Sequence, residues 1–218
     1  MKQKQTYFLL ASFALLSFML LGYLVKFIPQ DLKGIDASIQ LAVRGNLATN
    51  MTRFFKVVTQ FGHEVFIFAY VLLLALIFYF GKKWKVEAIF LVTNLLIMGI
   101  LSTGFKHFYG RPRPDLHYLI AKPMGASFPS WHAASTMVVA LSLSVIIAQH
   151  LSHKSLVYLL QALLLLIAVA TGLSRIYLGV HYPSDILGGW LLALALVAFV
   201  YPFYDQKRFE WRFQGKQE

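Results

Sequence analysis

Three cationic side chains lie at or near the ends of long apolar runs, where membrane proteins rarely place charge without a function. They are Lys106, Arg113 and Arg175. Three fixed positive charges can bind an anion with several oxygen atoms, and the planar fork of arginine holds two such oxygens at once. The transition state of phosphoryl transfer spreads its charge over three oxygens. The set therefore indicates a site that binds a phosphate group and could assist its transfer.

Side chains that can move protons or attack phosphorus occur in the same parts of the sequence. His132 follows Ser130 at the start of an apolar run, and His181 precedes Asp185 by four residues. Each also has a simpler interpretation when taken alone. Serine and aspartate are common helix caps, histidines occur at membrane interfaces, and the cations can extend from helix ends toward water. The placement of these residues in the fold decides between the two interpretations.

Six apolar runs are long enough to form the elements that position these residues. A membrane-spanning helix needs about 20 apolar residues, because it rises about 1.5 Å per residue through a core about 30 Å thick. The first run follows Lys2 and Lys4 and has no small-residue cleavage site after it, so we expect a retained anchor helix. The sequence predicts an all-α bundle of six transmembrane helices, over residues 7–25, 65–80, 86–105, 133–149, 155–174 and 184–204.

The direction of the chain is expected to bring the polar groups to one face of the membrane. The third run ends at Lys106, and the loop after it carries Arg113 and leads to His132, where the fourth run begins. The fifth run ends at Arg175, and a short loop with His181 leads into the sixth. Because successive spans alternate in direction, both loops lie on the same side.

Composition supports lipid as the surroundings of the chain. Of the 218 residues, 58% are hydrophobic and 13% are charged, whereas soluble domains usually carry about 25% charged residues. The length fits one domain over residues 1–218. The net charge of +11 comes from short loops, which favours attraction to anionic lipids over nucleic-acid binding, and Arg111 is expected to attract such head groups. The absence of cysteine excludes disulfides, thiolate nucleophiles and cysteine-based zinc sites.

The segment from residue 28 to residue 62 is too polar to span a membrane. Apolar residues such as Ile35 and Ile39 recur in it near helical spacing, whereas Gln40 and Arg44 occupy the other face. We expect short amphipathic surface helices between spans 1 and 2, broken near residues 45–46. They would either lie on the membrane surface or pack against the bundle.

Basic residues predict the orientation of the bundle. The turn between the second and third runs contains Lys82, Lys83 and Lys85, and basic residues are denser around this turn and the two termini than in the opposite loops. By the positive-inside rule, we expect a multi-pass cell membrane protein with cytoplasmic termini. The polar site would then lie at the extracytoplasmic face.

The polar residues form three motifs that resemble those of the type 2 phosphatidic acid phosphatase family. Their order and spacing are similar over residues 106–185. One departure is visible, because Trp131 stands where the family usually has glycine. The tryptophan affects the local shape of the phosphate site and leaves its chemical groups in place. The motifs are Lys106-(six residues)-Arg113-Pro114, Pro129-Ser130-Trp131-His132 and Ser174-Arg175-(five residues)-His181-(three residues)-Asp185.

The resemblance implies a role for each of these residues. It implies His181 as the nucleophile and Asp185 as its partner, which fixes the tautomer of the ring and stabilises its positive form. His132 would protonate the departing alkoxide and later activate water. The residues that would bind phosphate are Lys106, Arg113, Ser130, Trp131 and Arg175.

The activity that the resemblance implies is a lipid phosphatase that works through a phosphohistidine, without a metal or other cofactor. The expected reaction converts phosphatidylglycerol phosphate to phosphatidylglycerol and phosphate, with undecaprenyl diphosphate as the alternative substrate. Two other classes remain open: a metal-dependent hydrolase that uses outer histidines with Asp185 or Asp115, and a non-enzymatic lipid binder or transporter. The expected partners are the bilayer and its lipid phosphate, with no nucleic acid and no obligatory protein partner.

Overall fold

A computed structural model describes residues 2–217, and helices account for most of them, with no strand in this range. Helices suit a chain in lipid because they satisfy every backbone polar group within one segment. Six of them are long and apolar enough to cross a membrane, which confirms the predicted six-span all-α bundle. They are α1 (Lys2–Phe27), α4 (Glu64–Leu76) with its π-helical continuation η2 (Ile77–Gly81), α5 (Lys85–Tyr109), α6 (Trp131–His150), α7 (Lys154–Tyr177) and α8 (Pro183–Phe213).

The helices begin and end within a few residues of the predicted runs, except at the end of α8. The apolar run was predicted to end at residue 204, but the helix continues to Phe213. Its polar extension makes side-chain contacts, since Lys207 pairs with Glu210 and Arg208 pairs with the buried Glu87. Hydropathy marks where the apolar segment ends, whereas helical hydrogen bonding continues beyond it.

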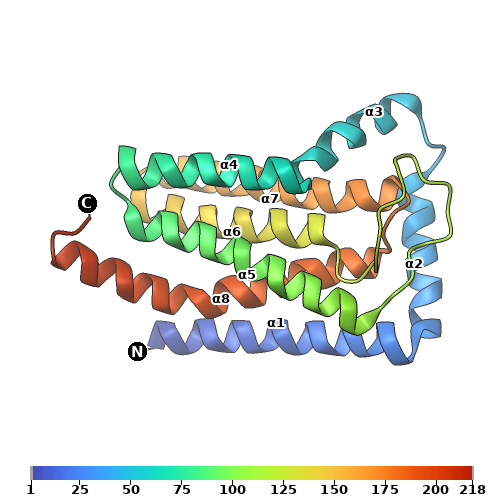
Figure 1. The fold of residues 1–218 in the computed structure, drawn as a ribbon, viewed down its shortest axis with the longest axis horizontal. Coiled ribbons are helices and arrows are strands. Elements are labelled where there is room, and N and C mark those ends of the chain that lie inside the picture. The colour runs from blue at the N-terminus through green and yellow to red at the C-terminus, as the bar shows by residue number, and fades with distance from the viewer. Residues whose placement is uncertain (1, 218) are drawn as a thin grey trace.

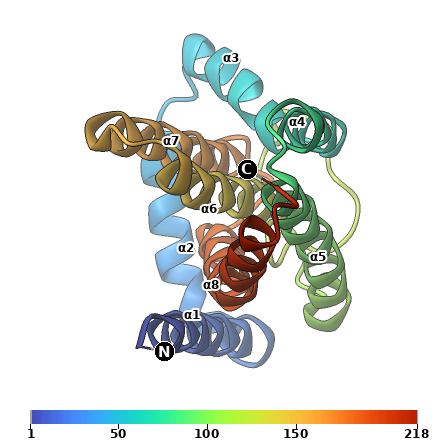
Figure 2. The same ribbon diagram turned by 90° about the vertical axis from the view of Figure 1, so that its left-hand side faces the viewer.

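Both ends of the described chain lie at the same end of the bundle (Figure 1). Helix α8 packs against α1, α5 and α6, and the view along the bundle places α6 and α8 among the other helices (Figure 2). These two spans are also the most buried of the six. The loops that carry the three motifs lie at the opposite end of the bundle from the termini (Figure 1).

The segment between the first two spans forms short helices, as predicted. Helix α2 (Pro29–Arg44) runs across the end of the bundle, and α3 (Thr49–Val58) and the 3-10 turn η1 (Thr59–Gly62) lead into α4 (Figure 1). The break falls at Gly45, whose φ is 48°.

The face of α2 that packs against the bundle is largely polar and is not the face that carries Ile35 and Ile39. Leu32, Asp36 and Gln40 are buried, whereas Ile35 is 61% exposed and Ile39 is also exposed. The reason is that the polar side chains have partners in the protein. Gln40 Nε2, for example, donates to the backbone oxygen of His181 at 3.3 Å. The apolar side of this helix is left to face the surroundings of the bundle.

Two adjacent glycines let the start of α6 lie directly on the start of α8. A Cβ atom on Gly188 would lie 2.4 Å from the ring of Phe128, and one on Gly189 would lie 2.9 Å from the backbone oxygen of Ser130. Phe128 is held in place by Phe18, with ring centroids 5.6 Å apart. This close approach brings the second and third motifs into contact.

Candidate active site

A cavity of about 550 Å³ lies among α4, α5, α6 and the motif loops. Its volume falls in the range typical of small-ligand sites. Six of the eight residues predicted for the site line it, although they come from three motifs that are separate in the sequence. These six are Lys106, Arg113, Trp131, His132, Arg175 and His181.

The other two predicted residues lie behind the cavity wall. Asp185 is fully buried, and its Oδ2 accepts a hydrogen bond from Nδ1 of His181 at 3.1 Å. Ser130 is also fully buried, but it does not line the cavity and its hydroxyl has no hydrogen-bond partner. Its contribution comes from the backbone, because its N–H donates to the backbone oxygen of Asp185 at 3.1 Å. Ser130 therefore joins α6 to α8 through its backbone, and its hydroxyl is not among the groups that line the cavity.

The hydrogen bonds of His181 define the tautomer of its ring. Arg113 Nη1 lies 3.2 Å from Nε2 of His181, and arginine can only donate. Nε2 must therefore carry the lone pair, while Nδ1 carries the hydrogen that is donated to Asp185. Burial, together with the positive charges of Lys106 and Arg175, lowers the pKa of His181 well below its usual value. The free site thus holds a neutral imidazole whose unprotonated nitrogen belongs to the cavity wall.

The three cations of the cavity are held by neutral groups. Lys106 Nζ donates to the backbone oxygen of Ala126 at 2.7 Å, and Arg175 Nη1 donates to Oγ1 of Thr59 at 2.8 Å. Arg113 donates to backbone oxygens of its own loop and of Val180. Within residues 2–217, no carboxylate lies within ion-pair distance of any of the three. Their charge is therefore left to be balanced by an anion.

Arg111 is a site residue that the sequence did not reveal. It was expected to attract lipid head groups, but it is buried between two carboxylates. Its Nη1 lies 2.7 Å from Oδ1 of Asp185, and its Nη2 lies 2.8 Å from Oδ2 of Asp36. The available signal was weak: Asp36 shares one helical stripe with Leu32, four residues away. A carboxylate on such a stripe needs a buried partner.

Comparison of the chain with known protein families shows which family has this arrangement of residues. The model of the PAP2 superfamily matches residues 87–209, which is more than half of the chain. The chain belongs to the PAP2 superfamily. The matched range contains all eight residues predicted for the site.

Individual relatives of this PAP2 protein are phosphatases of membrane lipids. It is 33% identical over 158 residues to phosphatidylglycerophosphatase B of Bacillus subtilis (strain 168), which covers 69% of this chain and 73% of that one. It is 30% identical over 150 residues to undecaprenyl-diphosphatase BcrC of the same organism, with coverage of 66% and 72%. The crystal structure of a transmembrane PAP2 type phosphatidylglycerolphosphate phosphatase from Bacillus subtilis has the same fold, with a TM-score of 0.82, 24% identity, and coverage of 91% and 96%. The chain is thus a multi-pass PAP2 family lipid phosphatase.

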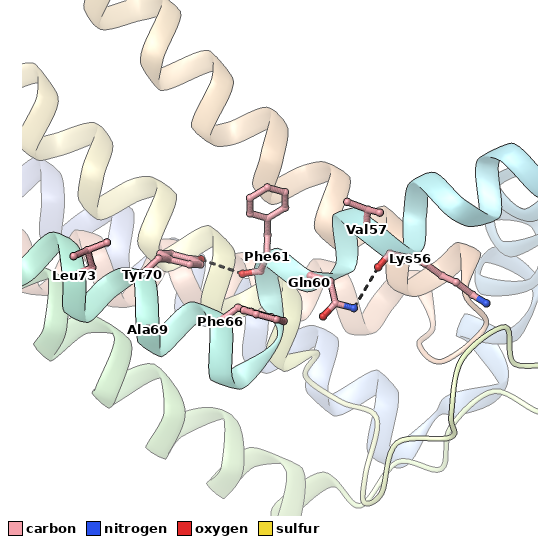
Figure 3. Close-up of a pocket in the computed structure, with 8 residues that line it drawn as sticks. All are labelled: Lys56, Val57, Gln60, Phe61, Phe66, Ala69, Tyr70 and Leu73. Atoms are coloured by element: carbon pink, nitrogen blue, oxygen red, sulfur yellow. Dashed lines mark hydrogen bonds between the residues drawn. The ribbon is translucent and has the colours of Figure 1, made fainter.

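A second, apolar cavity of this PAP2 phosphatase lies where η1 meets α4 (Figure 3). Its volume is about 630 Å³, and none of the eight predicted residues lines it. It uses a different face of α4, because Phe66 and Tyr70 line it, whereas Glu64 and Phe68 line the cationic cavity. The larger cavity is therefore separate from the candidate active site.

Asp115, one of the two carboxylates of the metal-dependent alternative, lies apart from the cationic cavity. Asp115 is exposed and does not line it. Over residues 2–217, no three histidine or carboxylate side chains gather in a way that could hold a metal ion.

Proposed function

We propose that this phosphatase hydrolyses phosphatidylglycerol phosphate to phosphatidylglycerol and inorganic phosphate, through a phosphohistidine at His181. The observation that carries the proposal is the extent of the cationic cavity. Lys106 marks its polar end, and Gly99 lines it seven residues earlier, about 10 Å along α5. Phe68 of α4 lines the same part. A phosphate held by the cations would leave its acyl chains to pass between α4 and α5 into the lipid.

The tryptophan that replaces the family glycine supports this division of the cavity. The ring of Trp131 stacks near Phe68, with centroids 6.2 Å apart. It also faces Gly99, where a Cβ atom would lie 3.7 Å from the indole ring. The side chain therefore borders the apolar part of the cavity. We expect Trp131 to influence how the lipid next to the phosphate is bound, and to have less effect on the binding of the phosphate by the cations.

In the first step of the proposed reaction, the phosphoryl group moves from the lipid to His181. Lys106, Arg113 and Arg175 would bind the equatorial oxygens, and Arg113 would leave Nε2 of His181 to do so. Nε2 then forms a bond to phosphorus while the bond from phosphorus to the lipid oxygen breaks. The imidazolium form of His132 gives its proton to that oxygen, and phosphatidylglycerol leaves.

In the second step, water removes the phosphoryl group. Neutral His132 takes a proton from water as the water oxygen attacks phosphorus, and the bond from phosphorus to nitrogen breaks. Asp185 stabilises the positive ring of His181 between the two steps. The products are inorganic phosphate and the starting form of both histidines.

The preference for a phosphate monoester is supported by Glu64. This exposed carboxylate lines the cavity together with the three cations. A diphosphate would bring a second phosphate directly beside the scissile one, where Glu64 would repel it. In phosphatidylglycerol phosphate, a glycerol unit that carries a hydroxyl donor follows the scissile phosphate. The chain is 33% identical to phosphatidylglycerophosphatase B and 30% identical to undecaprenyl-diphosphatase BcrC of the same organism, which agrees with this choice.

The proposed substrate preference can be tested by measuring phosphate release in matched micelles with EDTA present. The two lipids compared are phosphatidylglycerol phosphate and undecaprenyl diphosphate. We expect a higher kcat/KM for phosphatidylglycerol phosphate. Glu64→Gln should reduce the difference in kcat/KM between the two lipids, because it keeps the size of the side chain and removes the charge that repels a diphosphate. A higher kcat/KM for the isoprenoid would contradict the proposed substrate. No release from either lipid would favour a lipid binder, and loss in EDTA restored by zinc would favour a metal enzyme.

We further propose that the termini are cytoplasmic and that the cavity opens at the extracytoplasmic face, as the basic turn at residues 82–85 suggests. The chain has no cysteine, so single cysteines give a clean labelling assay. In intact cells, a membrane-impermeant maleimide should label Asp115→Cys, and it should label Lys82→Cys only after permeabilisation. The reverse pattern would show that the orientation is wrong.

A further inference from the structure

We infer that Asp36, on the surface helix α2, is a positioning residue for the reaction: through Arg111 it holds the carboxylate of Asp185 and balances the charge behind His181. The inference rests on the proposed phosphohistidine mechanism. It gives α2 a part in the chemistry, although α2 lies outside both the motifs and the range matched by the family model.

A continuous series of hydrogen bonds joins Asp36 to the imidazole. Asp36 is 2% exposed, and its Oδ2 accepts from Nη2 of Arg111 at 2.8 Å. Nη1 of Arg111 donates to Oδ1 of Asp185 at 2.7 Å. The other oxygen of Asp185 accepts from Nδ1 of His181 at 3.1 Å. Asp36 and His181 are thus linked through two intermediate side chains.

Ser184 locks this series in position. Its backbone N–H donates to Oδ1 of Asp36 at 2.9 Å, and its hydroxyl donates to Oδ2 of Asp36 at 2.7 Å. The same hydroxyl accepts from Nη1 of Arg111 at 2.7 Å. Arg111 also lies over the ring of Tyr182, with Cζ 3.9 Å from its centroid. Asp36 therefore fixes both the arginine that contacts Asp185 and the residue that precedes Asp185 in α8.

The charges of this cluster suit the reaction. Asp36 and Asp185 are negative and Arg111 is positive, so the three together carry one negative charge. When His181 is phosphorylated, its ring gains one positive charge and the cluster becomes neutral. Without the charge of Asp36, the charges of Arg111 and Asp185 would cancel. The positive ring of His181 would then have no net negative charge behind it, although the cavity in front of it is lined by three cations. Because the cluster is buried, this imbalance would be weakly screened.

Asp36→Asn, assayed with phosphatidylglycerol phosphate in micelles, tests the inference. The asparagine keeps the size of the side chain but removes its charge and presents N–H donors to Arg111. We expect kcat to fall by about 10- to 100-fold, by analogy with the cost of removing a residue that orients a metal ligand, because Asp36 supports Asp185 in the same indirect way. KM should stay within about twofold, because Asp36 does not line the phosphate cavity.

Arg44→Gln is the matched control. Arg44 also ties α2 to the site end of the bundle, through the backbone oxygens of Tyr177 at 3.0 Å and His117 at 2.8 Å. It contacts neither Arg111 nor Asp185. The control should keep kcat near that of the unmodified protein if the effect of Asp36 comes from its place beside Arg111.

The inference would be wrong if Asp36→Asn kept its kcat, if it changed only KM, or if Arg44→Gln lowered kcat equally. Should Asp36→Asn not fold, Ser184→Ala replaces it in the test. Loss of that hydroxyl should lower kcat at constant KM, and an unchanged kcat would overturn the inference. Inactivity of the unmodified protein toward lipid phosphates would instead contradict the proposed function, so the two failures differ.

Discussion

His181→Ala is expected to lower phosphate release by about 10⁶-fold, the scale on which an enzyme responds to loss of its covalent nucleophile. The physical reason is that Nε2 of His181 is the unprotonated nitrogen that Arg113 and Asp185 orient. Of the two imidazoles in the cavity, only His181 has its other nitrogen bonded to a buried carboxylate. Release of phosphate from lipid micelles by the purified variant measures the effect.

His107→Ala is a suitable control for this prediction. His107 is exposed, its ring contacts the backbone oxygen of Thr103, and it does not line the cavity. It should keep full activity and thus rule out a general effect of removing a histidine near the membrane surface. Turnover by His181→Ala at a rate close to that of the control would end the phosphohistidine proposal.

His132→Ala is expected to lower turnover of lipid substrates by about 10²- to 10⁴-fold, the usual contribution of a general acid–base group. His132 lines the cavity together with Trp131 and His181, and we expect it to reach the lipid oxygen of a phosphate bound there. The variant should still bind lipid phosphate, because the three cations remain. Phosphate release and KM together measure the two effects.

A substrate with a better leaving group distinguishes the two roles proposed for His132, as an acid in the first step and as a base in the second. p-Nitrophenolate leaves without a proton, so His132→Ala should release one equivalent of it from p-nitrophenyl phosphate rapidly and then stall. The stall is expected because the second step still needs a base to activate water. Equal losses for both substrates, with no rapid phase, would mean that His132 only shapes the cavity.

The spans and the residues of the cavity could be predicted because each leaves a local signal. An apolar run of sufficient length has few alternatives to a membrane-spanning helix. Alternation of the spans then places Lys106 and Arg175 at the same end of the bundle. The six cavity residues follow from that rule and from the motif spacing.

The support behind the cavity could not be predicted, because it depends on which face of a helix turns inward. In α2, the sequence shows an apolar face with Ile35 and Ile39 but left open which face packs against the bundle, and in the structure Asp36 and Gln40 are buried. Polar groups at a membrane surface can find their best partners inside the protein. The role of Arg111 follows from this contact between distant segments, which no local pattern records.

Ser130 and Trp131 illustrate a different limit. Both belong to a motif that the sequence assigns to phosphate binding. In the structure, Ser130 is buried and does not line the cavity, and the indole of Trp131 packs near Phe68. Motif membership thus places the backbone at the site, while neighbouring packing decides where each side chain points.

Trapping the phosphorylated protein tests directly whether His181 is the nucleophile. His132→Ala would be incubated with p-nitrophenyl phosphate that carries a radiolabelled phosphate, quenched during the rapid phase and digested. We expect an acid-labile, base-stable label on the peptide that contains His181, and no label when His181→Ala is added to the same variant. Label on any other residue, or an acid-stable label, would contradict this role of His181.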